Sequence, residues 1–320
     1  MRDVHGLHHV TAIAGPAQEN LDFYSGVLGM RLVKKSVNQD DPGTYHLFYA
    51  DAEGHPGSDL TFFPWSQMAP ARAGHGLASE VSLAVPPGSL GWWQERLAAH
   101  GVEQSAVEER FGEQVLPLRD PHGLRVALVE SATAGERPFT PWAGSPVPVE
   151  RQVRGLDGAR LDVRLLVPSE RFLADALGYR EVGREGDWHR FGVGAGGSGR
   201  YLDLRETPAA PRGAWGTGTI HHLAFRVDDE EHQLAARAQA TAAGARPTEV
   251  IDRFWFRSVY FKEPGGVLLE LATDGPGFTV DETPESLGEA LVLPPWLESH
   301  RAEIEQVLPP LSQPAAVVRG

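Results

Sequence analysis

The sequence predicts an α+β protein built from four repeated βαβββ units, and three observations support this prediction. First, 36 glycines and 25 prolines among 320 residues indicate many short elements separated by turns. Second, four segments share one plan, in which a short alternating strand precedes an amphipathic helix and several further strands. Third, each predicted helix ends at a glycine, and these glycines are nearly evenly spaced. They are residues 29, 101, 178 and 244.

The first two units occupy the first part of the chain. Unit one (residues 7–65) begins with the strand HHVTAI, and its helix is expected to end in a left-handed cap at Gly29. Unit two (residues 78–130) begins with the strand VSLAV. Its helix, GWWQERLAAH, follows the expected capping residue Ser89 and ends at Gly101.

Units three and four repeat this order. Unit three (residues 155–206) has the strand LDVRLLV and a helix that ends at Gly178. Unit four (residues 219–273) has the strand IHHLAFRV, followed by a helix that begins at Asp228 and ends at Gly244. Units two and four also end alike, with DPHGLRVALVE and EPGGVLLELAT, in which a Pro-x-Gly turn leads into an apolar strand.

Two domains are expected, because the chain is about twice the length of a typical domain. Residues 131–154 are rich in proline and polar residues and lack apolar periodicity, so they are the predicted linker. The predicted N-terminal domain covers residues 1–130 and the C-terminal domain residues 155–275. A C-terminal extension, residues 276–320, is expected to pack on them and to contain a helix at residues 296–307.

Composition excludes several functional classes. With 29 basic and 43 acidic residues the formal net charge is −14, so neither nucleic acid nor an anionic membrane is an expected partner, and small molecules are favoured. The absence of cysteine excludes disulfides, thiolate metal sites and cysteine nucleophiles. Apolar runs are too short to span a bilayer and no export signal is visible, so we expect a cytoplasmic protein.

Two histidine pairs stand at the same place in two repeats. His8 and His9 lie in the first strand of unit one, and His221 and His222 lie in the first strand of unit four. Successive side chains of a strand point to opposite faces, so one histidine of each pair is expected to face the cleft. Glu270, a lone carboxylate in the apolar strand VLLEL, is costly to bury unless it is paired or bound to a metal.

Two histidines and one carboxylate form the facial triad that binds ferrous iron. The alternative is that these histidines are structural and that the glutamate is exposed. The other units lack the triad, because Glu80 and Gly158 stand at the histidine positions and Ala127 at the carboxylate position. We therefore predict two half-barrel lobes, with units one and four paired around the metal and units two and three forming a metal-free lobe.

The chain resembles the vicinal oxygen chelate superfamily, and within it the ring-cleaving hydroquinone dioxygenases, over nearly its whole length. The similar sequences include GLHHVTAI, GHPGSDLTFFPW, IHHLAFRV and EPGGVLLELATD. In that family the second histidine of each pair and the glutamate of the last strand bind Fe(II), which implies His9, His222 and Glu270 here. The resemblance also implies five residues near these ligands or at the substrate. They are His8, Thr11, His221, Arg253 and Tyr260.

Each of these five residues has an expected role. A cleft-facing Arg253 would anchor an oxyanion, and Tyr260 would donate a hydrogen bond to the substrate oxygen, although a surface salt bridge and a core position are the respective alternatives. His221 is the predicted proton shuttle. Strand alternation counts against direct catalytic roles for His8 and His221, whereas Thr11 shares the face of its strand with the neighbouring metal-binding histidine.

Other aromatic and imidazole side chains are less informative. Residues 254–256, Phe-Trp-Phe, are expected either to wall an aromatic pocket or to belong to the core. His46 and His55 are interpreted as structural and are not assigned to the site.

These observations together predict an Fe(II)-dependent dioxygenase that opens hydroquinone-type rings with O2. Mn(II) is the alternative metal, because one triad binds several divalent ions. The expected partners are a small aromatic diol and O2, and a homo-oligomer is left open. Three alternative functions are kept: catechol-type extradiol cleavage, a glyoxalase-type reaction, and small-molecule binding or resistance without catalysis.

Overall fold

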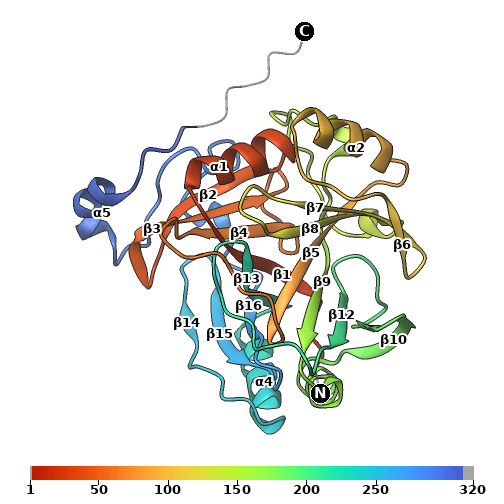
Figure 1. Cartoon of the computed structure of the whole chain (residues 1–320). Coiled ribbons are helices and arrows are strands. Elements are labelled where there is room, and N and C mark those ends of the chain that lie inside the picture. The colour runs from red at the N-terminus through yellow and green to blue at the C-terminus, as the bar shows by residue number, and fades with distance from the viewer. Residues whose placement is uncertain (1, 313–320) are drawn as a thin grey trace.

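The computed structural model describes residues 2–312, and its main feature is a pair of curled eight-stranded sheets (Figure 1). We call them the outer and the inner sheet, after the parts of the chain that form them. The outer sheet has the strand order β14 (Ile251–Asp252), β15 (Arg257–Lys262), β16 (Leu268–Thr273), β13 (Thr219–Val227), β1 (Leu7–Ala14), β4 (Asp59–Pro64), β3 (Asp41–Ala50) and β2 (Arg31–Asn38).

The inner sheet is built in the same way. Its strand order is β10 (Arg180–Glu185), β11 (Trp188–Gly192), β12 (Tyr201–Glu206), β9 (Gly155–Val163), β5 (Leu77–Val85), β8 (Arg125–Glu130), β7 (Glu113–Arg119) and β6 (Glu108–Arg110). The predicted fold class is therefore confirmed. Units one and four form one half-barrel sheet, and units two and three form the other.

The first strands of paired units join the two halves of each sheet. In the outer sheet β1 runs antiparallel to β13, and in the inner sheet β5 runs antiparallel to β9. Each of these four strands also pairs in parallel with the last strand of its own unit. The antiparallel pairing of β1 with β13 places the two histidine pairs on neighbouring strands.

Short helices follow the first strand of each unit. They are α1 (Ala17–Leu21) with a π-helical continuation (Asp22–Val27), α2 (Leu90–Ala99), α3 (Leu166–Phe172) with a π-helical continuation (Leu173–Leu177), and α4 (Glu230–Ala242). The predicted glycine stops are confirmed, because their φ angles are all positive: 70°, 67°, 84° and 96°. No helix within residues 2–312 is long and apolar enough to cross a membrane.

The predicted helix caps differ in detail from the structure. Ser89 is the N-cap residue of α2, as predicted, but its side chain makes no capping hydrogen bond, and the Leu90 N–H instead donates to Glu130 Oε1 at 2.9 Å. Helix α4 is capped by Asp229 rather than Asp228, because the backbone of Asp229 is extended and its carboxylate accepts the N–H three residues on at 2.8 Å.

The proposed domain limits fall between strands of the inner sheet. β8 ends at Glu130 and β9 begins at Gly155, and the intervening chain forms two 3-10 turns, Ala134–Glu136 and Val149–Arg151. Both sheets take one unit from each half of the sequence. The domain limits predicted at residues 130 and 155 therefore remain a proposal about how the sequence is divided.

The C-terminal extension partly fills the hollow of the outer sheet. Phe278 in a 3-10 turn (Phe278–Val280) and Leu287 are buried in a cluster with Phe48 and Trp255. The helix predicted at residues 296–307 is shorter: it consists of a 3-10 turn, Glu298–His300, and α5, Arg301–Val307. The extension thereby packs against two residues, Phe48 and Trp255, that also line the cavity described below.

Candidate metal centre

Three buried side chains from adjacent strands converge at the middle of the outer sheet. His9 Nε2 on β1 lies 3.2 Å from His222 Nε2 on β13. Glu270 Oε2 on β16 lies 2.9 Å from His222 Nε2 and 3.2 Å from His9 Nε2. All three residues are at most 3% exposed. The structure thus brings together the three ligands that the sequence predicts.

This spacing fits a single divalent cation. Ligand atoms about 2.1 Å from one ion and about 90° apart around it lie about 3 Å from one another. Glu270 Oε2 is sealed from solvent and makes no hydrogen bond of ordinary geometry within the described chain. A buried carboxylate oxygen without such a partner is costly, and a bound cation would remove that cost.

The remaining oxygen and nitrogen atoms of the three groups are held by neighbours. Ser258 on β15 donates to Glu270 Oε1 at 2.5 Å. His8 Nδ1 lies 2.9 Å from His9 Nδ1, and His221 Nδ1 lies 2.8 Å from the Nδ1 of the ligand beside it. If the ligands bind through Nε2, each donates its Nδ1–H to the adjacent histidine, and this bond fixes its tautomer and ring orientation.

His8 and His221 thus support the ligands from behind. A register irregularity in β1 between Leu7 and His9 accompanies the contact made by His8. His8 lines a separate hollow on the far side of Phe256, whereas His221 lies in the outer part of the cleft, where its ring stacks on Trp215 at 4.3 Å. Strand alternation is confirmed, because one histidine of each pair belongs to the converging group.

The Ser258 hydroxyl gives a direct test of this supporting contact. We expect Ser258→Ala to weaken metal binding by about 10- to 100-fold, because the carboxylate loses the bond that orients it. Chelator competition measures the affinity. Ser36→Ala is the matched control, since the buried Ser36 hydroxyl has no hydrogen-bond partner among residues 2–312. Equal metal affinities of the two variants would contradict the role of Ser258.

The charge states of the site follow from burial and from the triad itself. Burial raises the pKa of Glu270, but its interactions with His9 and His222 outweigh this and hold the pKa well below its ordinary value. Burial lowers the pKa of His222. Burial, with the charge of His222, lowers the pKa of His221 to about 3. The ionised form of Glu270 and the neutral form of His222, which these shifts favour, are the forms that bind a metal.

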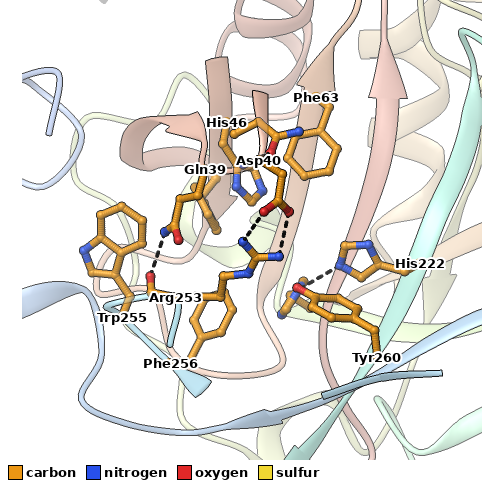
Figure 2. A pocket seen from close by; sticks show the side chains of 12 residues that line it. Gln39, Asp40, His46, Phe63, His222, Arg253, Trp255, Phe256 and Tyr260 are labelled. Carbon is orange, nitrogen blue, oxygen red and sulfur yellow. Dashed lines mark hydrogen bonds and ion pairs between the residues drawn. The ribbon is translucent and has the colours of Figure 1, made fainter. Parts of the chain in front are cut away.

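A cavity of about 380 Å³, counting its open side, leads to the ligands (Figure 2). It continues into a wider outer hollow of about 670 Å³. The two share the lining residues Asn38, Asp40, Phe63, His222, Arg253 and Tyr260. The inner part is further lined by His9, Gln39, His46, Phe48, Trp255 and Phe256. Aromatic side chains form much of its wall, and two of the three triad residues, His9 and His222, line it.

Arg253 and Tyr260 both line this cavity. Arg253 forms a two-bond ion pair with Asp40, at 2.8 and 3.2 Å, and its backbone carbonyl accepts a bond from Gln39 (Figure 2). Burial lowers the pKa of Arg253, but the bond to Asp40 outweighs this and raises it. The guanidinium therefore combines both expected positions, since it is ion-paired and it faces the cleft.

Tyr260 pairs directly with Glu270 across β15 and β16, and its ring stands edge-on to His222 at 5.6 Å. Burial raises its pKa, so its hydroxyl keeps its proton and is available as a donor. In the aromatic run, Trp255 and Phe256 belong to the cavity wall. Phe254 packs outside it, against Trp296.

Thr11 does not line the cavity, and His46 does. The Thr11 hydroxyl lies 2.8 Å from that of Thr61, which in turn lies 2.9 Å from His46 Nε2. Burial and the charges of both ligand histidines lower the pKa of His46 well below its ordinary value. The interpretation of His46 as structural missed this position. His46 and Phe48 are two residues apart in the same strand, so their side chains point to the same face of the sheet. This alternation is the signal that could have placed His46 beside an aromatic wall residue.

Comparison with known proteins agrees with this geometry. The sequence matches the family described as "Glyoxalase/Bleomycin resistance protein/Dioxygenase superfamily" over residues 6–128 and 164–271. The chain belongs to this superfamily. It is 43% identical, over 95% of its length and 96% of the relative's, to "Putative ring-cleaving dioxygenase MhqO" of Bacillus subtilis. It is 36% identical, over 94% and 95%, to "Chlorohydroquinone/hydroquinone 1,2-dioxygenase" of Sphingobium indicum.

Solved structures show the same superfamily fold. A "putative dioxygenase" from Bacillus subtilis matches 98% of this chain and 99% of its own, with a TM-score of 0.90 and 42% identity. Maize glyoxalase I matches 84% and 92%, with a TM-score of 0.61 and 15% identity, and therefore shares the fold alone. The resemblance to the superfamily and to its ring-cleaving dioxygenases is confirmed.

In the inner lobe of this superfamily member, ion pairs stand where the outer lobe has the triad. By strand register Glu80 takes the place of His9, and Asp203 takes the place of Glu270. The Arg160 guanidinium lies between these carboxylates, 3.8 Å from Glu80 and 3.6 Å from Asp203. Arg110 binds Glu80 at 2.5 Å. A guanidinium thus occupies the region that corresponds to the candidate metal position.

A second group of potential ligands consists of the exposed residues His5 and Asp228 and the buried His232. Arg2 already binds Asp228 at 2.7 Å. The group also stands at the first turn of α4, whose positive end disfavours a cation. Within residues 2–312 the buried triad is therefore the better metal centre.

Proposed function

We propose that this protein is an Fe(II)-dependent dioxygenase that opens hydroquinone-type aromatic rings with O2. The observation that carries the proposal is the convergence of His9, His222 and Glu270 beside a cavity that the two histidines and several aromatic side chains line. The relative named as a chlorohydroquinone/hydroquinone 1,2-dioxygenase supports the choice of substrate. The buried triad gives a binding-only protein no evident advantage, which favours catalysis.

The triad would hold iron through His9 Nε2, His222 Nε2 and Glu270 Oε2. Iron bound in this way supplies open coordination positions and one-electron chemistry with O2. The protein supplies the surroundings. Tyr260 would donate its O–H to the oxygen of the bound phenol, and Arg253 would stabilise negative charge that develops on the ring oxygens.

The supporting residues would act indirectly, through the side chains that they contact. His8 and His221 would hold the two ligand imidazoles in place, and Thr11 would act through Thr61 on His46, which lines the cavity. Proton transfer by His221 stays a prediction, for which its place in the outer cleft is the support. Because Asp40 balances the charge of Arg253, the cavity favours a neutral ring over a carboxylated one.

Anaerobic loading of the protein with Fe(II), and separately with Mn(II), tests the function. Oxygen uptake is then measured with hydroquinone, methylhydroquinone and catechol, and the products are examined by mass spectrometry after reaction with ¹⁸O2. We expect the Fe(II) protein to open the para-diols and to incorporate both oxygen atoms. Activity with Mn(II) alone would change the metal assignment.

The same assay separates the alternatives. Cleavage of catechol in preference to hydroquinone would indicate the catechol-type reaction. The absence of oxygen uptake with every diol would overturn the dioxygenase proposal and favour a glyoxalase-type or binding role. The expected cytoplasmic location is a separate prediction that fractionation of cells would test.

A further inference from the structure

We infer that His46 binds the hydroxyl group that lies at the far end of the substrate ring from the metal. The inference deepens the proposed function and rests on it. A ring with para hydroxyls, held at the triad by one oxygen, presents its second oxygen to the opposite part of the cavity. His46 is the side chain that the structure offers there.

The strand order places His46 opposite Tyr260. The ligands lie on β16, β13 and β1, at the centre of the outer sheet. Tyr260 lies on β15, at one side of these strands, and His46 lies on β3, at the other side beyond β4. Figure 2 shows His46 beside Phe63 on one side of the cavity, with Tyr260 on the other side.

The His46 ring is fixed before any ligand binds. Its centroid lies 3.9 Å from that of Phe48 and 4.5 Å from that of Phe63. Its Nε2 bonds to the Thr61 hydroxyl at 2.9 Å, and that hydroxyl bonds to Thr11 at 2.8 Å. A ring held by two aromatic contacts and a hydrogen bond loses little further freedom when it binds a ligand.

The other nitrogen of His46 is available. Within residues 2–312 its Nδ1 has no protein partner, and it is not among the polar atoms sealed from solvent. Several polar atoms of the neighbouring residues are already engaged. Gln39 donates to the Arg253 carbonyl, the Asp40 carboxylate binds the Arg253 guanidinium, and Asn38 Oδ1 accepts the Asp40 N–H at 2.9 Å.

This arrangement would select the substrate by the position of its second hydroxyl. A para-diol satisfies His46 Nδ1, whereas a phenol or a catechol leaves that nitrogen without a partner in a largely aromatic wall. A site built to bond a substrate hydroxyl discriminates strongly against a ligand that lacks it, because a polar group of the site is then left unpaired. His46 is thus a specificity-determining residue and not a metal ligand.

Equilibrium binding to the Fe(II)-loaded protein without O2 tests the inference. The variants are wild type, His46→Phe, His46→Gln and, as the matched control, His55→Ala, whose histidine lies outside this cavity. We expect wild type and His55→Ala to bind hydroquinone about tenfold more tightly than phenol. His46→Phe should bind the two equally, with phenol binding unchanged, and His46→Gln should recover part of the difference.

Turnover of hydroquinone by the wild type distinguishes the possible failures. If the wild type does not open the ring, the proposed function fails and the inference fails with it. If it does, an undiminished preference for hydroquinone in His46→Phe and His46→Gln overturns the inference alone. Loss of the preference in Asn38→Ala, with His46→Phe unaffected, overturns it as well and assigns the distal hydroxyl to Asn38.

Discussion

Replacing His222 by alanine is expected to remove the bound metal and to lower ring cleavage at least about a thousandfold, since metal ligation supplies several kcal/mol to the transition state. The reason is geometric. His222 Nε2 lies within 3.2 Å of both other ligand atoms, so its removal opens the site at its centre. Metal content per chain and oxygen uptake with hydroquinone measure the two effects.

His55→Ala is the control for this variant, because it removes an imidazole that lies outside the triad. Glu270→Gln separates metal loss from unfolding. It removes the negative charge while keeping the shape of the side chain, so the variant should lose the metal while its circular dichroism spectrum still matches that of folded, metal-free wild type. Full metal content in either triad variant would exclude that residue from the site.

Replacing Glu80 by alanine is expected to lower the free energy of unfolding by about 3 to 5 kcal/mol. Glu80 is 1% exposed, and its carboxylate contacts Arg110 at 2.5 Å and Arg160 at 3.8 Å. Those two arginines are only 7% and 8% exposed. Without Glu80 they keep their desolvation cost and lose a buried counter-ion. Urea unfolding of the metal-free protein measures the change.

Glu103→Ala is the matched control for that measurement. Glu103 also contacts an arginine, Arg119 at 3.2 Å, but its side chain is 76% exposed. A pair in water of this kind contributes only about 0 to 1 kcal/mol. Equal effects of the two substitutions would show that the inner ion pairs are not needed for stability. The folded fraction of Glu80→Ala should still bind metal in the outer lobe.

The repeats explain why so much of the fold could be predicted. The recurring helix stops fix the number of units, and the histidine pairs occur only in units one and four, so the pairing of those units follows from their shared ligands. The triad was predictable for the same reason. A histidine that occurs at the same position in two repeats, but not in the other two, can be recognised by comparing the repeats of this one chain.

The rest depends on contacts that leave little mark in the sequence. The ion pair between Arg253 and Asp40 joins residues 213 positions apart, and neither is unusual where it stands. His46 faces the cavity only because β3 curls over the centre of the outer sheet, beyond β4. The inner-lobe network was likewise hidden, because Glu80 and Asp203 acquire their meaning from Arg160, which lies between them.

The pairing of β1 with β13 also sets an order of assembly during synthesis. β1 leaves the ribosome early, but its antiparallel partner begins at Thr219, and His9 and His222 are separated by 213 residues. The inner sheet is fully encoded once β12 ends at Glu206. It can therefore close while β1 still presents an unpaired edge, which is prone to wrong pairing. The three triad residues therefore come together only after the inner sheet can form, and a metal bound by them cannot guide the folding of that sheet.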